Sequence, residues 1–203
     1  ASEGTMTQTG GLVSDATVTP TREPTPTSTP ESSGELLEDS ILAQALIVVE
    51  LLNRADMESL ATYVHPEMDL RFSPYAFVQE TDIVFTVDQI PGLFADNMSY
   101  RWGVYDGRGD PIKLTFAEYY ERFVYDQDFA NPEKIAFNER IGGSGGTINN
   151  ISEFYPDSMM VEFHFSGFNP DYAGLDWRSL RLVFMQYEEE WLLVGIVHDE
   201  WTT

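Results

Sequence analysis

Apolar residues recur at helical spacing where the chain first shows a regular pattern. Asp39 or Ser40 can cap a helix there, because a short polar side chain accepts a hydrogen bond from the first helical turn. The stripe that follows predicts one broad buried face, formed by Ile41, Ala45, Val48 and Leu52 and widened by Leu42, Leu46 and Val49. The helix is expected to end near Asn53.

Shorter helices are predicted after this one. One runs from Met57 to Val64 with Asp56 as its cap, and another is capped by Asp88 and ends at Phe94. The segments LRFSPYAFV and DIVFTV, which lie between these helices, are predicted to be extended because aromatic and β-branched residues are frequent in them.

A capping box marks the start of the next helix. In Thr115-Phe-Ala-Glu118 each side chain can bond the backbone of the other residue. The apolar positions of the helix are Phe116, Tyr119, Tyr120 and Phe123. Just before it, YRWGVYDGRGDPIKL predicts a strand, a tight turn and a second strand, since Asp and Gly fill its centre.

Beyond this helix the period of the apolar pattern changes to that of strands. Five strand candidates follow one another: KIAFNERI, INNISEFY, SMMVEFHF, SLRLVFMQY and WLLVGIVHD. Helices first and strands afterwards predict an α+β fold, in which helices cover one face of a strongly curved antiparallel sheet.

The N-terminal part differs in composition from the rest. The stretch TVTPTREPTPTSTPESSGE offers almost nothing to bury, so its ordering would not be offset by packing. We therefore predict a disordered tether over residues 1–35 and a folded domain over residues 36–203. The chain begins at Ala1 without Met, and such tethers space a domain from a surface. Both features favour an exported protein, anchored to a membrane through the tether; a cytosolic disordered terminus is the alternative.

Charge and residue content narrow the classes of partner. The net charge of −23 repels phosphates, which argues against nucleic acid and anionic membrane surfaces. Cations or a basic surface could bind, but the simpler explanation is that the acidic charge keeps the protein soluble. No run of apolar residues is long enough to span a membrane.

The chain has no Cys and only three His, and HExxH is absent. Asp126-Gln-Asp128 starts like a calcium loop, but Asn131 and Phe137 stand where that loop needs Gly and Glu. No metal or cofactor is expected.

A family resemblance rests on the longer motifs. RLVFMQYEEEWLLVGIVHDEW resembles the closing hairpin of NTF2-like (SnoaL-like) domains, which form a cone of helices against a bent sheet. VVELLNRADMESLATYVHPEMDLRFSPYAFV, GLDWRSLRLVF and LVGIVHDEWT are together similar to an uncharacterised family of bacterial secreted or lipoprotein-type proteins. The resemblance covers roughly residues 40–203 and implies a fold and a compartment. It implies no activity, and no catalytic position of NTF2-like enzymes matches a residue here.

The last strand candidate runs into His198, Asp199 and Glu200. Side chains alternate along a strand, so Asp199 points away from the other two and the three do not form one cluster. We expect a strand buried on both faces up to this point, with the charges placed where burial stops. A catalytic site is the alternative.

The strand candidate SMMVEFHF carries the best candidate pocket. Glu162 and His164 share the face opposite its fully apolar face, with Met160 deeper, and Arg181 is the odd basic residue of the neighbouring strand. We expect Glu162, His164 and Arg181 at the mouth of the cone, where a carboxylate beside a histidine suits general acid–base chemistry. A half-exposed, salt-bridged face is the alternative.

These observations leave three hypotheses for function. The first is a non-catalytic extracellular or cell-surface domain that binds a small molecule or a protein partner, without assigned catalytic residues. The second is a small hydrolase or isomerase that uses Glu162 and His164. The third is a structural module that forms a homodimer through its sheet. In addition, Arg108-Gly-Asp110 forms an RGD tripeptide, which good turn chemistry explains by itself.

Overall fold

The structure is a computed structural model that describes residues 1, 4–6, 10–11, 33–143 and 148–202. Most of the predicted tether, residues 1–35, lies outside these residues. The chain divides into a unit up to Glu31 and a unit from Ser32 to Thr203, and everything below concerns the second. Its first helix begins at Ser33, so residues 33–35, placed in the tether above, are helical.

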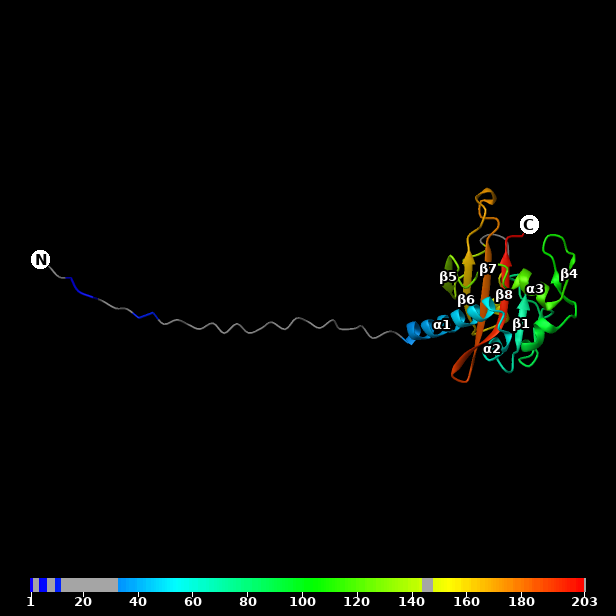
Figure 1. The fold of residues 1–203 in the computed structure, drawn as a ribbon, viewed down its shortest axis with the longest axis horizontal. Coiled ribbons are helices and arrows are strands. Elements are labelled where there is room, and N and C mark those ends of the chain that lie inside the picture. The colour runs from blue at the N-terminus through cyan, green and yellow to red at the C-terminus, as the bar shows by residue number, and fades with distance from the viewer. Residues whose placement is uncertain (2–3, 7–9, 12–32, 144–147, 203) are drawn as a thin grey trace. The chain divides into compact units, whose positions relative to one another are not determined.

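Helices precede and interrupt the strands, which gives the α+β class that the sequence predicts (Figure 1). The helices are α1 Ser33–Asn53, α2 Met57–Ala61, η1 Ile90–Ala95, α3 Phe116–Phe123, α4 Ile151–Phe154 and η2 Pro170–Tyr172. The strands are β1 Leu70–Ser73, β2 Ile83–Phe85, β3 Tyr100–Val104, β4 Pro111–Leu114, β5 Lys134–Phe137, β6 Met159–Phe165, β7 Arg178–Tyr187 and β8 Glu190–Glu200.

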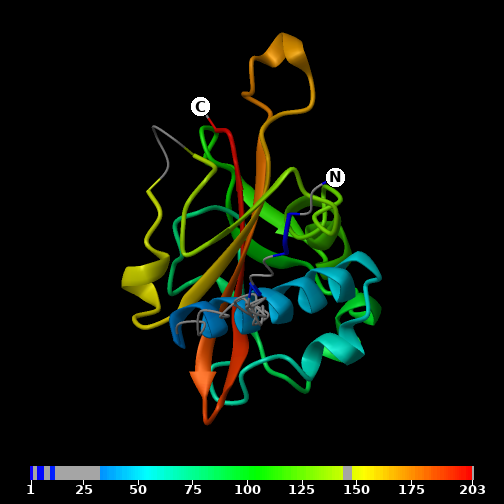
Figure 2. The same cartoon turned by 90° about the vertical axis from the view of Figure 1, so that its left-hand side faces the viewer.

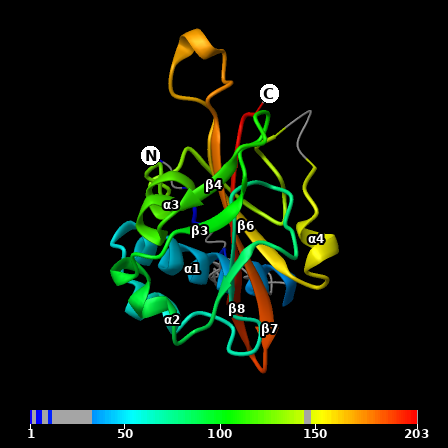
Figure 3. The same ribbon diagram turned by 90° about the vertical axis from the view of Figure 1, so that its right-hand side faces the viewer.

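The main sheet is mixed, so the prediction of an antiparallel sheet is wrong in one place. Its strand order is β2-β1-β8-β7-β6-β5, and β5 to β8 form the predicted antiparallel meander. However, β1 runs parallel to β8, with Phe72 opposite Ile196. Alternation of apolar residues shows that a segment is a strand but carries no information on the direction of its partner. β3 and β4 form a separate hairpin, which lies beside α3 (Figure 3).

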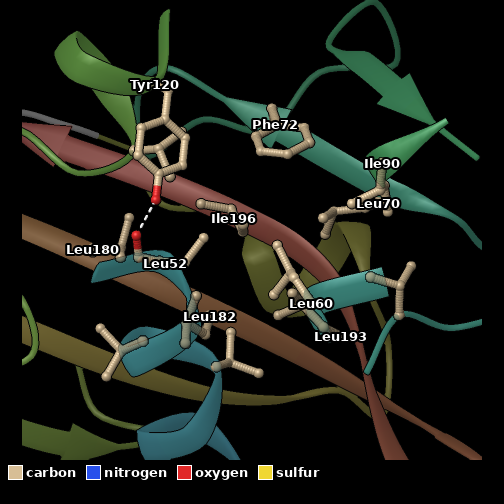
Figure 4. Close-up of a cluster of buried hydrophobic side chains, with 14 of the residues drawn as sticks. Leu52, Leu60, Leu70, Phe72, Ile90, Tyr120, Leu180, Leu182, Leu193 and Ile196 are labelled. Carbon is tan, nitrogen blue, oxygen red and sulfur yellow. Dashed lines mark hydrogen bonds between the residues drawn. The ribbon is translucent and has the colours of Figure 1, made fainter. Parts of the chain in front are cut away.

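Helix α1 lies across β6, β7 and β8 and covers one face of the sheet (Figures 1 and 2). The predicted stripe Ile41, Ala45, Val48 and Leu52 is fully buried, and Val49 is buried beside it. Leu46 is exposed, so the predicted face is too wide there. Each large apolar side chain buried in this way stabilises the fold by about 1.5–3 kcal/mol. Figure 4 shows this core, where the Tyr120 hydroxyl donates to the carbonyl of Leu52.

Two of the four predicted helix starts follow the local signals and two do not. The cap predicted at Asp39 or Ser40 is wrong, because α1 already begins at Ser33. The Asp56 carboxylate accepts from the amide of Ser59 and caps α2, and both bonds of the capping box at Thr115 are present. By contrast, the cap predicted at Asp88 is wrong, because Gln89 takes the N-cap position of η1 and makes no side-chain cap. Helices therefore begin as predicted where a complete hydrogen-bonding motif is encoded.

The strand predicted at INNISEFY is wrong, since this segment forms α4. Asn150 precedes the helix and is buried, with its side-chain amide bonded to both backbone groups of Val78. The segment therefore folds over the sheet face opposite α1. A second, smaller apolar cluster lies there, formed by Val78, Ile151, Tyr155, Met160, Val183, Val194 and Val197. Among the described helices, none has the length and apolar content to cross a membrane.

Candidate functional site

The predicted pocket residues Glu162, His164 and Arg181 come together on the sheet face away from α1. Glu162 on β6 lies directly opposite Arg181 on β7, and His164 lies opposite Ser179. The alternating residues of β6, Val161 and Phe163, enter the core under the helices, as the sequence predicts. Yet Glu162 and Arg181 are 0% exposed and His164 is 5% exposed, so no open mouth exists at these three residues.

Glu162 is held by several donors. Its carboxylate accepts from Ser179 Oγ at 2.6 Å, from Arg181 Nε at 2.9 Å, and from the amides of Gly142 at 2.8 Å and Ile141 at 3.2 Å. Burial by itself would raise the pKa of Glu162. The charge of Arg181 and these hydrogen bonds outweigh burial and lower the pKa, so the group is ionised at neutral pH.

Ser179 bridges Glu162 and His164, which the sequence analysis did not anticipate. Its hydroxyl lies 2.8 Å from His164 Nδ1, and its proton goes to Glu162 because an ionised carboxylate only accepts. We therefore assign the His164 proton to Nδ1, which donates to Ser179 Oγ. Burial lowers the pKa of His164, more than the nearby Glu162 charge raises it, so the ring is neutral at pH 7. This order differs from a Ser-His-acid triad, where the histidine lies between the other two.

Arg181 joins this cluster to Asp199 on β8. Its Nη1 lies 2.8 Å from Asp199 Oδ2, and Arg140 Nη2 lies 3.7 Å from the same oxygen. Neither carboxylate oxygen of Asp199 has a hydrogen bond of good geometry to the described residues. Burial raises the pKa of Asp199, and the two guanidinium groups offset this only in part. Arg181 is therefore bound more firmly to Glu162 than to Asp199.

The buried cluster is closed by Gly142 and Trp177. A Cβ atom added at Gly142 would lie 2.7 Å from the Trp177 ring and would also overlap Ser179 Oγ. The Trp177 ring lies 6.0 Å from that of His164. With these residues in place Glu162 is closed to solvent, and His164 keeps only 5% exposure.

The last residues of β8 are buried, so the expected strand end at the water boundary is wrong. His198 and Asp199 are 0% exposed and Glu200 is 6% exposed. The predicted alternation is confirmed, because Asp199 faces Arg181 and the other two face α3. His198 Nε2 lies 3.3 Å from Asp126, and Glu200 pairs with Arg122 at 2.5 Å. Cations from other elements thus allow the strand to carry charges into the interior.

An open groove lies where β8 ends. It has a volume of about 1130 Å³. Five aromatic residues from four segments of the chain line it: Tyr75, Phe77, Tyr105, Trp177 and Trp201. Phe77 is 47% exposed and Trp201 is 41% exposed, so the groove presents apolar surface from two segments to solvent. The loop that carries η2 projects beyond the sheet at this same end (Figures 2 and 3).

Charges at the groove are few and partly compensated. Glu200 lies in the lining but is paired with Arg122 and, at 3.0 Å, with Arg178. The exposed charged groups in the lining are Asp106 and Arg108, which lie on either side of Gly107 in the β3–β4 turn. Trp177 belongs both to the groove and to the cover of the buried cluster, so the predicted pocket residues lie behind the groove wall.

The calcium-like segment and the RGD tripeptide have structural explanations. Asp126, in the calcium-like segment, pairs with Arg178 at 2.9 Å, and Asp128 accepts from Tyr125 and Asn131. Within the described parts of the chain, no three His, Asp or Glu side chains gather in a way that could hold a metal ion. The RGD tripeptide forms the exposed β3–β4 turn.

The groove was not predicted because its aromatic residues come from four separate places in the sequence. A weak signal exists, since each aromatic residue stands beside turn-forming or charged residues, in SPYAF, VYDGRG, GLDW and HDEW. Such a position keeps a large ring near the surface. Comparison with protein-family models, with curated proteins and with solved structures finds no match to this chain.

Proposed function

We propose that this chain is a non-catalytic binding domain and that the aromatic groove takes up a small molecule or a segment of a partner protein. The observation that carries the proposal is the exposure of Phe77 and Trp201 in one open groove of about 1130 Å³. Ligand sites are concave and largely apolar, with few polar groups that fix orientation. Tyr75 and Asp106 supply such groups here.

The hydrolase or isomerase alternative has less support. Glu162 is engaged by Arg181, Ser179 and two backbone amides, and His164 donates to Ser179. A general base needs a free lone pair within reach of a substrate proton. The Glu162 oxygens are engaged and 0% exposed, and His164 keeps only Nε2 free in a residue that is 5% exposed. The buried cluster is better explained as an ionic core between strands.

The proposal includes a location, a fold family and an assembly. The Thr/Pro-rich composition before the domain supports a domain held outside the cell on a tether. The helix α1 across the β5–β8 meander supports an NTF2-like cone. Homodimerisation has one specific support, which lies on α1 and not on the sheet: Leu36, Leu46 and Ile47 of this helix are exposed.

The binding proposal is tested by nuclear magnetic resonance of the indole N–H groups. The probes are a glucose trisaccharide, acetyl-tetraproline amide and an arginine-containing pentapeptide. At least one probe is expected to shift the signals of Trp177 and Trp201, which line the groove, and to leave buried Trp102 unchanged. The absence of any shift at the two groove signals would contradict the proposal.

A matched pair of variants controls for general surface effects. Phe77 and Phe168 are both 47% exposed, but only Phe77 lines the groove. Phe77→Ala is expected to weaken binding of the active probe, whereas Phe168→Ala leaves it unchanged. Equal loss in both variants would place binding outside the groove.

A further inference from the structure

Three aromatic rings pack together at one side of the groove and form an aromatic layer: Tyr75 and Tyr105 line the groove, and Phe123 lies in the core behind them. The rings of Tyr75 and Tyr105 both pack on Phe123, at centroid distances of 5.8 Å and 6.2 Å. Two guanidinium groups of the chain rest on this layer: Arg108 lies 4.7 Å from the Tyr105 ring and Arg122 lies 4.4 Å from the Phe123 ring. The layer is therefore suited to flat cations, which the negative faces of aromatic rings attract.

The two arginines differ in how firmly they are held. Arg122 also pairs with Glu200 at 2.5 Å. Arg108 lies on the exposed turn between Gly107 and Gly109, both at φ +71°. Across residues 33–143 and 148–202 the structure shows no ion pair or hydrogen bond to its guanidinium group. Contact with Tyr105 alone holds Arg108, and such a contact at an exposed position is weak.

We propose that the groove binds a basic segment of another protein through an arginine side chain, which replaces Arg108 on the face of Tyr105. This rests on the proposed binding function of the groove. The net charge of −23 attracts a basic partner, and Asp106 beside Tyr105 offers an exposed carboxylate. The open shape of the groove admits an extended chain. Arg108 thus acts as an internal competitor.

Arginine fits this surface better than lysine. Its guanidinium group is planar and weakly hydrated, so it stacks on a ring at a small cost in lost water contacts. An ammonium group is compact and strongly hydrated. A neutral side chain of the same shape, such as citrulline, lacks the charge that the ring and Asp106 attract.

Calorimetric titration of the full chain tests the ligand class. The probes are three acetylated and amidated peptides of sequence Ala-X-Ala-X-Ala, where X is arginine, lysine or citrulline. We expect the arginine peptide to bind tightest and the citrulline peptide to bind at least about fivefold more weakly, as expected for loss of a cation–π contact with a nearby carboxylate. Equal affinity of the arginine and citrulline peptides would overturn the proposal.

A pair of arginine variants separates competition from general charge. Arg108→Ala and Arg101→Ala each remove one positive charge from an exposed position of the β3–β4 hairpin, but Arg101 does not line the groove. Arg108→Ala is expected to tighten binding of the arginine peptide about two- to fivefold, because it frees the Tyr105 ring. Arg101→Ala is expected to leave affinity nearly unchanged. Equal tightening in both variants, or weaker binding of Arg108→Ala, would overturn the proposal.

The outcomes distinguish this inference from the binding function on which it rests. If the trisaccharide or the proline peptide shifts the Trp177 and Trp201 signals and the arginine peptide does not, the groove binds a neutral ligand and only the arginine proposal fails. If no probe shifts these signals, both proposals fail.

Discussion

Glu162 and Arg181 face each other across β6 and β7, both 0% exposed, with Arg181 Nε 2.9 Å from the Glu162 carboxylate. Asp199 lies on the far side of the same guanidinium group, 2.8 Å from Nη1. Arg181 therefore has one carboxylate on each neighbouring strand. The two carboxylates differ in hydrogen bonding, which makes their contributions to stability separable.

Glu162→Gln is expected to destabilise the domain by about 3 kcal/mol or more, because it breaks a buried pair and weakens the bonds from Ser179 and Gly142. Asp199→Asn is expected to cost only about 1 kcal/mol, since the Asp199 oxygens have no hydrogen bond of good geometry and burial raises the pKa of this carboxyl. Urea unfolding at pH 7 measures both. A larger loss for Asp199→Asn would show that Arg181 depends chiefly on β8.

Protonation of His164 is expected to destabilise the fold. Burial lowers the folded-state pKa of His164 below its ordinary value of 6.5, so the unfolded chain binds this proton more readily. The stability that the neutral ring contributes is complete above about pH 6.5 and is lost as the pH falls through the folded-state pKa, by at most about 1.4 kcal/mol per pH unit. Free energies of unfolding at pH 7.5, 6.5 and 5.5 measure the slope. In His164→Gln the free energy of unfolding should depend less steeply on pH over this range. Parallel pH dependences in the variant and the original chain would rule out this role of His164.

Gly142→Ala is expected to cost about 1–3 kcal/mol, because the new methyl group would lie 2.7 Å from the Trp177 ring and overlap Ser179 Oγ. Gly92→Ala is the control, since an added Cβ there meets nothing within 4 Å. Thermal unfolding of the two variants gives the comparison. If both melt alike, Gly142 and Trp177 do not close the buried cluster tightly.

Thr115→Ala is expected to destabilise the domain by about 1 kcal/mol, because it removes the side chain that accepts from the Glu118 amide at the start of α3. Thr115→Ser keeps that oxygen and should retain most of the stability. Chemical unfolding of the two variants checks this. Equal loss in both would assign the effect to the Thr115 methyl group.

Local patterns were enough to place most elements and the parity of side chains. Alternation in SMMVEFHF correctly separated Val161 and Phe163, which enter the core, from Glu162 and His164 on the other face. The same reasoning could not show that Glu162 is buried, because its cover comes from Gly142 and Trp177, which belong to other segments. Side-chain direction is a local property, whereas burial depends on the whole fold.

The prediction that β8 ends at the water boundary was wrong for a related reason. Charged residues after an apolar run usually mark the point where a strand meets water. Here Glu200 is covered, because Arg122 of α3 and Arg178 of β7 reach it. No pattern within WLLVGIVHDE contains those partners. The groove was missed on the same ground, since its rings share a surface only after the chain has folded.

The placement of Arg181 between two acidic strands has a consequence for how β6, β7 and β8 find their alignment. An apolar alternation repeats every two residues, so a shift of two residues would leave Val161, Phe163 and their neighbours on the core side. Glu162 lies directly opposite Arg181, so a two-residue shift of β6 against β7 would separate this pair and leave both charges buried without each other. Asp199 lies opposite Ser179, so its contact with Arg181 restricts the alignment of β7 and β8 less strictly. We infer that the ionic core selects one alignment among those that the apolar pattern tolerates, and that replacing all three residues by leucine would give a domain that remains compact but pairs these strands in more than one way.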